Sequence, residues 1–158
     1  MLIAVLAAYV MTSGLLAGFF FAYWCSVMIG LRAVDNRVFV ETMQAINAAL
    51  PNGRFVVPFF TPAVLAPISA WLAFADGSDA SGWWSVGATV LSLVTLAITI
   101  TRNVPMNNAL AAAGDPESLD SAQLARGSFE APWTRWNDVR TYTSALAFAA
   151  GVGALAVL

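Results

Sequence analysis

Histidine and lysine are absent from this chain, and cysteine occurs once, as Cys25. The lack of histidine excludes His-ligated haem, His-ligated zinc and the usual non-haem iron triad, and it removes the commonest acid–base side chain. A single cysteine excludes a disulfide within the chain. Because Cys25 lies in an apolar run, a small buried hydrophobe is the favoured interpretation over a reactive thiol.

Charge is also scarce. Of 158 residues only 10% are charged and 59% are hydrophobic, with a mean hydropathy of +0.74. A soluble domain carries about 25% charged residues, so this chain could not cover a core with polar surface. The net charge is −2 without a basic patch, which argues against a nucleic-acid partner. We therefore expect a lipid bilayer around one membrane domain, residues 1–158.

Long apolar stretches set the expected architecture. About 20 apolar residues cross the hydrocarbon layer as a helix. We predict an all-α four-helix bundle, with a kink in the second span at Pro58, Pro62 and Pro67. The expected spans cover residues 2–29, 55–74, 83–101 and 139–158.

The polar segment after the first span, residues 32–50, predicts a short amphipathic helix at the membrane boundary. Asp35 can cap this helix, and apolar residues recur along one face from Val38 to Ala49. A Pro-Asn-Gly sequence at 51–53 predicts the turn that ends it.

The second polar segment covers residues 102–140. Helix is expected to resume after Arg102 and to run to Ala113, with a stop at the Gly-Asp-Pro sequence 114–116. A polar helical segment is expected over 117–126. Residues 127–132, from a glycine to a proline, predict a break before the last span.

Four spans place both termini and the loop at 75–82 on one side of the membrane. All seven arginines then fall on the other side or at its edge. The positive-inside rule predicts that the polar segments 32–54 and 102–140 are cytoplasmic, with both termini outside the cell membrane.

Polar residues form three clusters that this topology brings to one side. Together they predict a polar-rimmed pocket in the cytoplasmic half of the bundle. Helix capping by the asparagines and membrane anchoring by Trp and Arg are the alternatives for any single residue. Three coincident clusters favour a site. They are Arg32, Asp35, Gln44 and Asn47; Arg102, Asn103 and Asn107; and Trp133, Trp136, Asn137 and Arg140.

Three sequence strings connect these clusters: Asp35-(x3)-Phe39-Val40-(x2)-Met43-Gln44-(x2)-Asn47, Asn103-Val104-Pro105-Met106-Asn107 and Trp133-(x2)-Trp136-Asn137-(x2)-Arg140-Thr141. In this order and spacing they resemble the anthrone oxygenase-like family of small four-span membrane proteins, over nearly the whole chain. The resemblance implies oxidation of a flat phenolic or anthrone-type compound to a quinone by O2, with no cofactor and no metal.

That chemistry needs a base, a stabiliser for an oxyanion and an apolar pocket for ring and oxygen. The base would be Asp35 or Asp138; the alternatives are that Asp35 is an N-cap and that Asp138 pairs with Arg135. The other expected roles are oxyanion partners (Arg32, Arg102, Arg140), hydrogen-bond donors (Asn47, Asn103, Asn107, Asn137), stacking walls (Trp133, Trp136) and further substrate contacts (Phe39, Met43, Gln44).

Two other functions are compatible with the same residues. The pocket could bind a quinone, a lipid or another hydrophobic ligand without transforming it. The chain could also be a structural subunit of a larger assembly or a homo-oligomer, for which the small residues Gly14 and Gly18 would form a close helix contact.

Overall fold

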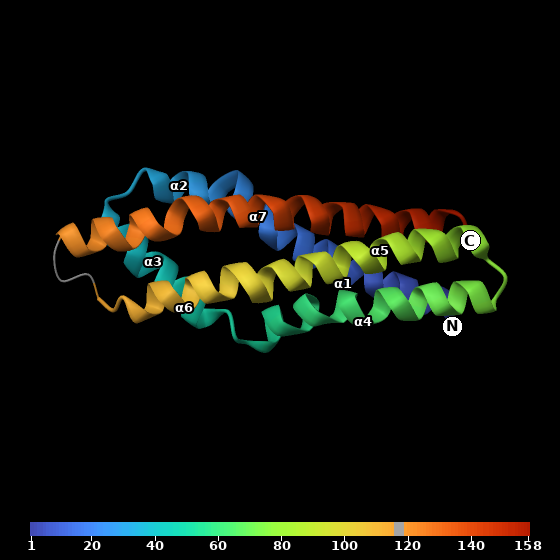
Figure 1. The fold of residues 1–158 in the computed structure, drawn as a ribbon. Coiled ribbons are helices and arrows are strands. Elements are labelled where there is room, and N and C mark those ends of the chain that lie inside the picture. Colours follow the sequence, from blue (N-terminus) through green and yellow to red (C-terminus); the bar gives the residue numbers. More distant parts are fainter. Residues whose placement is uncertain (116–118) are drawn as a thin grey trace.

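The computed structural model describes residues 1–115 and 119–158, and these residues are all-helical. The four long helices are α1 (Leu2–Ala22), α4 (Gly53–Ala75), α5 (Asp79–Ile98) and α7 (Leu119–Ala156). They run along one axis (Figure 1). Each contacts two of the others, because α1 and α5 both pack against α4 and against α7. The bundle is therefore a closed ring with a shared interior.

Three helical stretches are long and apolar enough to cross a membrane: Leu2–Arg32, Gly53–Ala75 and Asp79–Ala112. The expected fourth span, residues 139–158, lies in the second half of α7, where it forms the fourth member of the bundle. It is not among these stretches, and it carries the charged Arg140 and several hydroxyl side chains. Membrane crossing by this segment stays a prediction.

The first and third of these stretches are extended by π-helical turns. Turn η1 (Tyr23–Val27) joins α1 to α2 (Met28–Arg32), and η2 (Thr99–Asn103) joins α5 to α6 (Val104–Ala112). The helices thus continue beyond the expected ends at residues 29 and 101. A π-helical turn re-aims the side chains around it and is frequent at functional sites.

The predicted amphipathic helix is confirmed as α3 (Asn36–Ala49). Its N-terminus is capped by Asp35, whose Oδ1 accepts a hydrogen bond from the Val38 amide at 2.9 Å. The apolar face of α3 buries Phe39, Val40 and Met43 in one core cluster with residues of α7. Capping and burial together fix how α3 lies on the bundle.

The predicted break at residues 127–132 is wrong, because α7 runs through both Gly127 and Pro132. A proline costs one backbone hydrogen bond, and tertiary packing can compensate for it. Phe129 and Trp133, on either side of this proline, are buried in the cluster that receives α3.

Gly114 has a φ of +68° just after α6, as the predicted stop requires. Pro116 and Glu117, where that stop ends and the polar helix was expected to begin, lie outside the described residues.

Close helix packing depends on glycine at some positions. A Cβ on Gly14 would lie 3.1 Å from the ring of Phe148 on α7, whereas one on Gly18 would meet nothing within 4 Å. The expected close contact thus exists within the chain at Gly14 alone. Helix α4 is continuous through its three internal prolines, and its kink stays a prediction.

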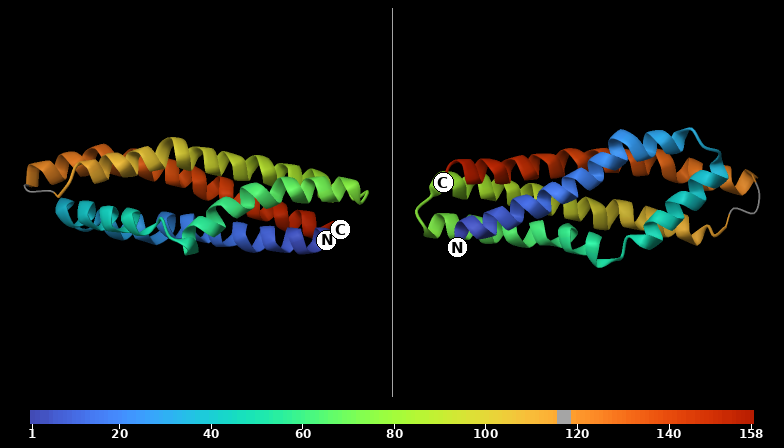
Figure 2. Two further views of the ribbon diagram at one scale, coloured as in Figure 1. Left: turned by 90° about the horizontal axis from the view of Figure 1, so that it is seen from below. Right: turned by 180° about the vertical axis from the view of Figure 1, so that it is seen from behind.

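The two ends of the bundle differ. Both termini and the α4–α5 turn lie at one end, and the α2–α3 connection, the end of α6 and the start of α7 lie at the other (Figures 1 and 2). The polar segments therefore gather at one end, as expected from the sequence. We call this the polar end; its orientation in a membrane stays a prediction.

Candidate functional site

A cavity of about 400 Å³ lies toward the polar end, between α1, α3, α4, α6 and α7. Cavities of roughly 300–1,000 Å³ suit small organic ligands. Aromatic side chains are the largest group in the wall, which also contains small apolar residues, a few amides and one cation. The aromatic side chains are Phe19, Phe20, Tyr23, Phe55, Phe59, Phe60 and Trp133, and the polar ones are Gln44, Asn47, Thr99, Asn107, Asn108 and Arg140.

Arg140 is the cation of this wall, and it is only 5% exposed. Its Nη2 donates to Asn137 Oδ1 at 3.0 Å and its Nη1 approaches Thr99 Oγ1 at 3.5 Å, while Nε has no hydrogen-bond partner in the part of the chain that the structure describes. The guanidinium lies 4.4 Å from the ring centroid of Phe20 and 5.4 Å from that of Trp133. No ion pair among the described residues includes Arg140. A buried cation without a counter-charge destabilises the folded protein, so its presence marks a candidate functional position.

Asn137 sits behind Arg140 rather than in the cavity. It lies about one helical turn earlier on α7 and is fully buried. Its Nδ2 donates to the Phe20 carbonyl at 3.4 Å, while its Oδ1 accepts from Arg140. Asn137 therefore orients the guanidinium against α1 without neutralising it.

Trp133 and Asn107 form the second fixed pair at the cavity. The indole Nε1 donates to Asn107 Oδ1 at 2.8 Å, which leaves the Nδ2 group of Asn107 as a donor to a ligand. The Trp133 ring is held by Phe129 at 5.8 Å and by Tyr23 at 5.5 Å between centroids. Asn103, buried beneath, donates to the Trp133 carbonyl at 3.4 Å.

Helix α3 supplies Gln44 and Asn47 to the cavity. Gln44 Nε2 donates to the carbonyls of Leu110 and Gly114 at 2.8 and 2.9 Å, and so ties α3 to the end of α6. Asn47 Nδ2 is buried and has no partner among the described residues. An unpartnered amide donor beside a cavity is a place where a ligand oxygen can bind.

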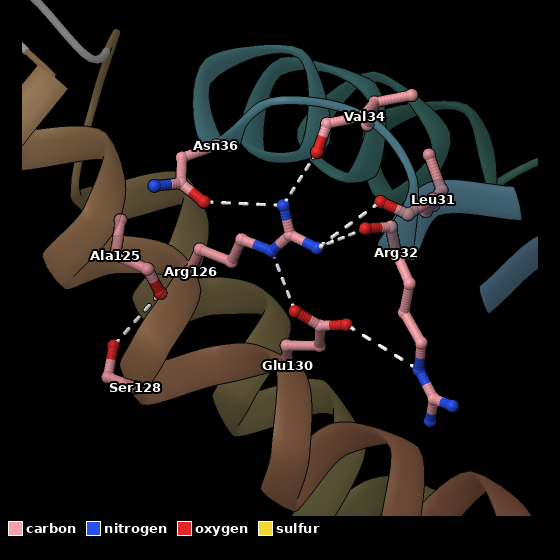
Figure 3. A network of polar contacts seen from close by, with 8 residues as sticks. All are labelled: Leu31, Arg32, Val34, Asn36, Ala125, Arg126, Ser128 and Glu130. Carbon is pink, nitrogen blue, oxygen red and sulfur yellow. Dashed lines mark hydrogen bonds and ion pairs between the residues drawn. The ribbon is translucent and has the colours of Figure 1, made fainter. Parts of the chain in front are cut away.

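A second polar network holds the α2–α3 turn on α7, with Arg126 at its centre (Figure 3). Arg126 Nη1 donates to the Val34 carbonyl at 2.9 Å, and its Nε pairs with Glu130 at 2.7 Å. The guanidinium also lies over the ring of Phe39 at 4.5 Å. Further acceptors are Asn36 Oδ1 and the carbonyls of Leu31 and Arg32. We call this network the Arg126 clasp; it anchors the start of the helix that bears Gln44 and Asn47.

The sequence-predicted site is thus divided. Gln44, Asn47, Asn107, Trp133 and Arg140 line one cavity. Asn103 and Asn137 are buried directly behind them.

The remaining predicted residues lie outside the cavity. Asp35 is an exposed N-cap, so that alternative is confirmed. Arg32 is exposed and lies 3.8 Å from Glu130. Arg102 is exposed, and its guanidinium carbon lies 5.1 Å from the ring centroid of Trp136. Phe39 and Met43 are core residues beneath α3. Asp138 forms no ion pair with Arg135 among the described residues, and it faces a different groove.

Sequence reasoning missed most of the aromatic wall. Phe19, Phe20 and Tyr23 come from a span that is apolar on every face, so no periodicity distinguishes cavity-facing from lipid-facing positions. Thr99 is brought to Arg140 by a π-helical turn that no local signal announces. The spacing of Phe19 and Tyr23, four residues apart, was the only available hint that they share a face.

Within residues 1–115 and 119–158, no group of three or more Cys, Asp or Glu residues is placed to hold a metal ion.

Fold and cavity together define a small helical membrane protein with an aromatic chamber at its polar end. The chain belongs to the anthrone oxygenase family, whose family model matches residues 54–150. No curated protein and no solved structure matches the chain. The matched region contains Asn107, Trp133 and Arg140, whereas α3 precedes it.

Proposed function

We propose that this protein is a cofactor-independent oxygenase, which oxidises a flat phenolic or anthrone-type compound to a quinone with O2. The observation that carries the proposal is Arg140, a buried cation without a counter-charge in an aromatic chamber. Such a group stabilises an oxyanion held against flat rings, and stabilising developing charge is a large source of catalytic power. Membership of the anthrone oxygenase family supports the same chemistry.

The reaction balances without a further reactant. The anthrone loses a proton from its CH2 carbon and becomes a carbanion whose charge is shared with the ring oxygen. One electron passes to O2, and the resulting radical pair combines to form a C–O bond. Protonation gives a hydroperoxide, which loses water to leave the quinone carbonyl. The sum is anthrone plus O2 giving quinone plus water.

Each lining group then has a role. Arg140 would hold the anionic ring oxygen, and the Nδ2 groups of Asn47 and Asn107 would donate to other ring oxygens. Phe20 and Trp133 would stack on the rings and exclude water. Asn103 and Asn137 would position this set from behind.

The proton that leaves carbon needs an acceptor. Among the described residues that line the cavity none is a carboxylate, so Asp35 and Asp138 do not contact the substrate there. Arg140 favours the anion and therefore makes the carbon acid stronger. We assign the proton to water at the cavity mouth.

The membrane arrangement belongs to the same proposal. Residues 139–156 of α7 would form a fourth span beside the three apolar stretches. Both termini would lie outside the cell, and the polar end would lie in the cytoplasm. An apolar aromatic substrate would then reach the chamber from the bilayer.

Quinone formation by the purified protein tests this proposal. The protein in lipid nanodiscs would be mixed with an anthrone in air, with a metal chelator and without flavin. Product absorbance would be compared with autoxidation in empty nanodiscs. A protein-dependent rate lost in Arg140→Gln supports the proposal, and a rate equal to that of empty nanodiscs contradicts it.

The described lining residues include no carboxylate, and this also favours a second candidate, which is binding of a quinone without turnover. Organic extracts of the purified protein would be analysed by mass spectrometry. A bound quinone together with no protein-dependent oxygen consumption would favour this second candidate.

A further inference from the structure

A second groove of about 400 Å³ lies on the other face of α7 from the chamber. Thr134 and Asp138, four residues apart on α7, form one wall. The other wall comes from the end of the first helical stretch and includes Trp24, Ile29 and Arg32. This groove is separate from the chamber, because the two share no lining residue.

The polar atoms of this groove are incompletely paired. Asp138 Oδ1 and Thr134 Oγ1 are buried and have no hydrogen-bond partner among the described residues. Burial raises the pKa of Asp138, and the positive charge of Arg32 opposes that rise. Arg32 itself is 59% exposed and makes one long contact, at 3.8 Å, to Glu130, which already pairs with Arg126 at 2.7 Å. The groove thus offers an available cation beside an acceptor that lacks a donor.

The surroundings of the groove suit a lipid. Arg32 is the first charged residue of the chain and ends an apolar stretch of membrane-spanning length. Trp24 and Ile29 are 40% and 58% exposed, which leaves apolar surface for an acyl chain. The rings of Trp24 and Tyr142 also pack edge-on, with 6.1 Å between their centroids. Trp and Tyr side chains are enriched at the level of the lipid headgroups.

We propose that this groove is a binding site for a phospholipid with a zwitterionic ethanolamine headgroup. Arg32 binds the phosphate, and Asp138 with Thr134 accepts hydrogen bonds from the ammonium group. Arg32 and Asp138 carry opposite charges, so together they are neutral, as is the zwitterionic ethanolamine headgroup. Choline has no N–H to donate, and a phosphatidylglycerol headgroup brings a net negative charge beside Asp138.

The test compares lipids of identical acyl chains. Wild-type protein in a mild detergent would be mixed with equal amounts of phosphatidylethanolamine, phosphatidylcholine and phosphatidylglycerol, and native mass spectrometry would report which lipid is retained. We expect ethanolamine lipid to be bound about tenfold more tightly than choline lipid, as a charge-assisted hydrogen bond implies. Equal retention of these two lipids, or preferred retention of phosphatidylglycerol, would overturn the proposal.

Variants separate the two ends of the headgroup. Asp138→Asn should remove the preference for ethanolamine over choline, and Arg32→Gln should weaken retention of all three lipids. Arg37→Gln is the matched control, because Arg37 is exposed and its one ion pair within residues 1–115 and 119–158 is with Glu41 on α3. A preference that persists in Asp138→Asn would contradict the assigned role of the carboxylate. The wild-type comparison needs no variant, so the proposal stays testable if a variant fails to fold.

Discussion

Arg140 Nη2 donates to Asn137 Oδ1 at 3.0 Å, and this neutral amide is the closest hydrogen-bond partner of a buried guanidinium. An aspartate at the same place would neutralise the cation. An asparagine orients it and leaves its charge available to a ligand. The pair accounts for how a chamber in an apolar bundle could hold an anionic ring oxygen.

Arg140→Met should separate stability from function. Methionine has a similar length and no charge, so the unfolding temperature in detergent should stay at or above that of the wild type. Protein-dependent quinone formation should fall by about 100-fold or more, as removal of one oxyanion donor does elsewhere. Differential scanning fluorimetry and initial rates measure the two effects. A large loss of stability would mean that Arg140 is structural.

A simple loss of packing would lower the unfolding temperature, whereas Asn137→Asp should raise it. The new carboxylate would lose the long 3.4 Å hydrogen bond to the Phe20 carbonyl but would form an ion pair with Arg140. Because the ion pair is the stronger interaction, the protein should unfold at a higher temperature while its affinity for an anionic ligand falls about tenfold or more. Thermal unfolding and ligand titration by absorbance would be recorded together. Asn36→Asp is the control, because Asn36 contacts the Arg126 clasp and not the chamber. Unchanged affinity in Asn137→Asp would count against the charge of Arg140 as the binding determinant.

Gly151→Val should destabilise the apolar half of the bundle. A Cβ on Gly151 would overlap the ring of Tyr9, whose hydroxyl is fixed by donation to the Ala147 carbonyl at 2.8 Å. Overpacking of this kind costs about 1–3 kcal/mol, measurable by thermal or denaturant unfolding in detergent. Gly18→Ala is the control, since nothing lies within 4 Å of its Cβ, and it should be tolerated. Equal stability of both variants would contradict the packing described for α1 and α7.

Arg126→Gln should loosen the attachment of α3. The side chain is 13% exposed and donates to three backbone carbonyls as well as to Glu130. Each hydrogen bond to a charged group that is lost costs roughly 1.5–3 kcal/mol of stability. Protease sensitivity of the α2–α3 turn should rise, and KM should rise more than kcat falls, because α3 carries Asn47. Arg37→Gln, on the solvent side of α3, should change neither. A pure kcat effect in Arg126→Gln would exclude the positioning role.

The sequence was informative where local chemistry decides the structure. Asp35 as an N-cap, with the apolar repeat after it, predicted α3 within the segment 32–50, and the number of spans predicted which segments share an end. It failed at Pro132, because the packing of Phe129 and Trp133 against α3 outweighs a lost backbone hydrogen bond. Long-range packing of this kind has no local signal.

The candidate site was predicted only in part, because long-range packing also decides which side chains face the chamber. Arg32, Arg102 and Arg140 look equivalent in the sequence, yet only Arg140 faces the chamber. The difference is set by helix rotation, which the π-helical turns at Tyr23 and Thr99 alter. Phe20 had no sequence signal because every face of its helix is apolar, and Tyr23 had only its spacing from Phe19.

The central claim is that Arg140 stabilises an oxyanion within the chamber. The most direct measurement is the pH titration of a hydroxyanthraquinone bound to the protein, followed by the colour change of its phenolate. The bound phenol should ionise at a lower pH than in empty nanodiscs, and Arg140→Gln should abolish this difference. Ionisation at an unchanged or higher pH, as an uncharged apolar chamber would give, would contradict the account.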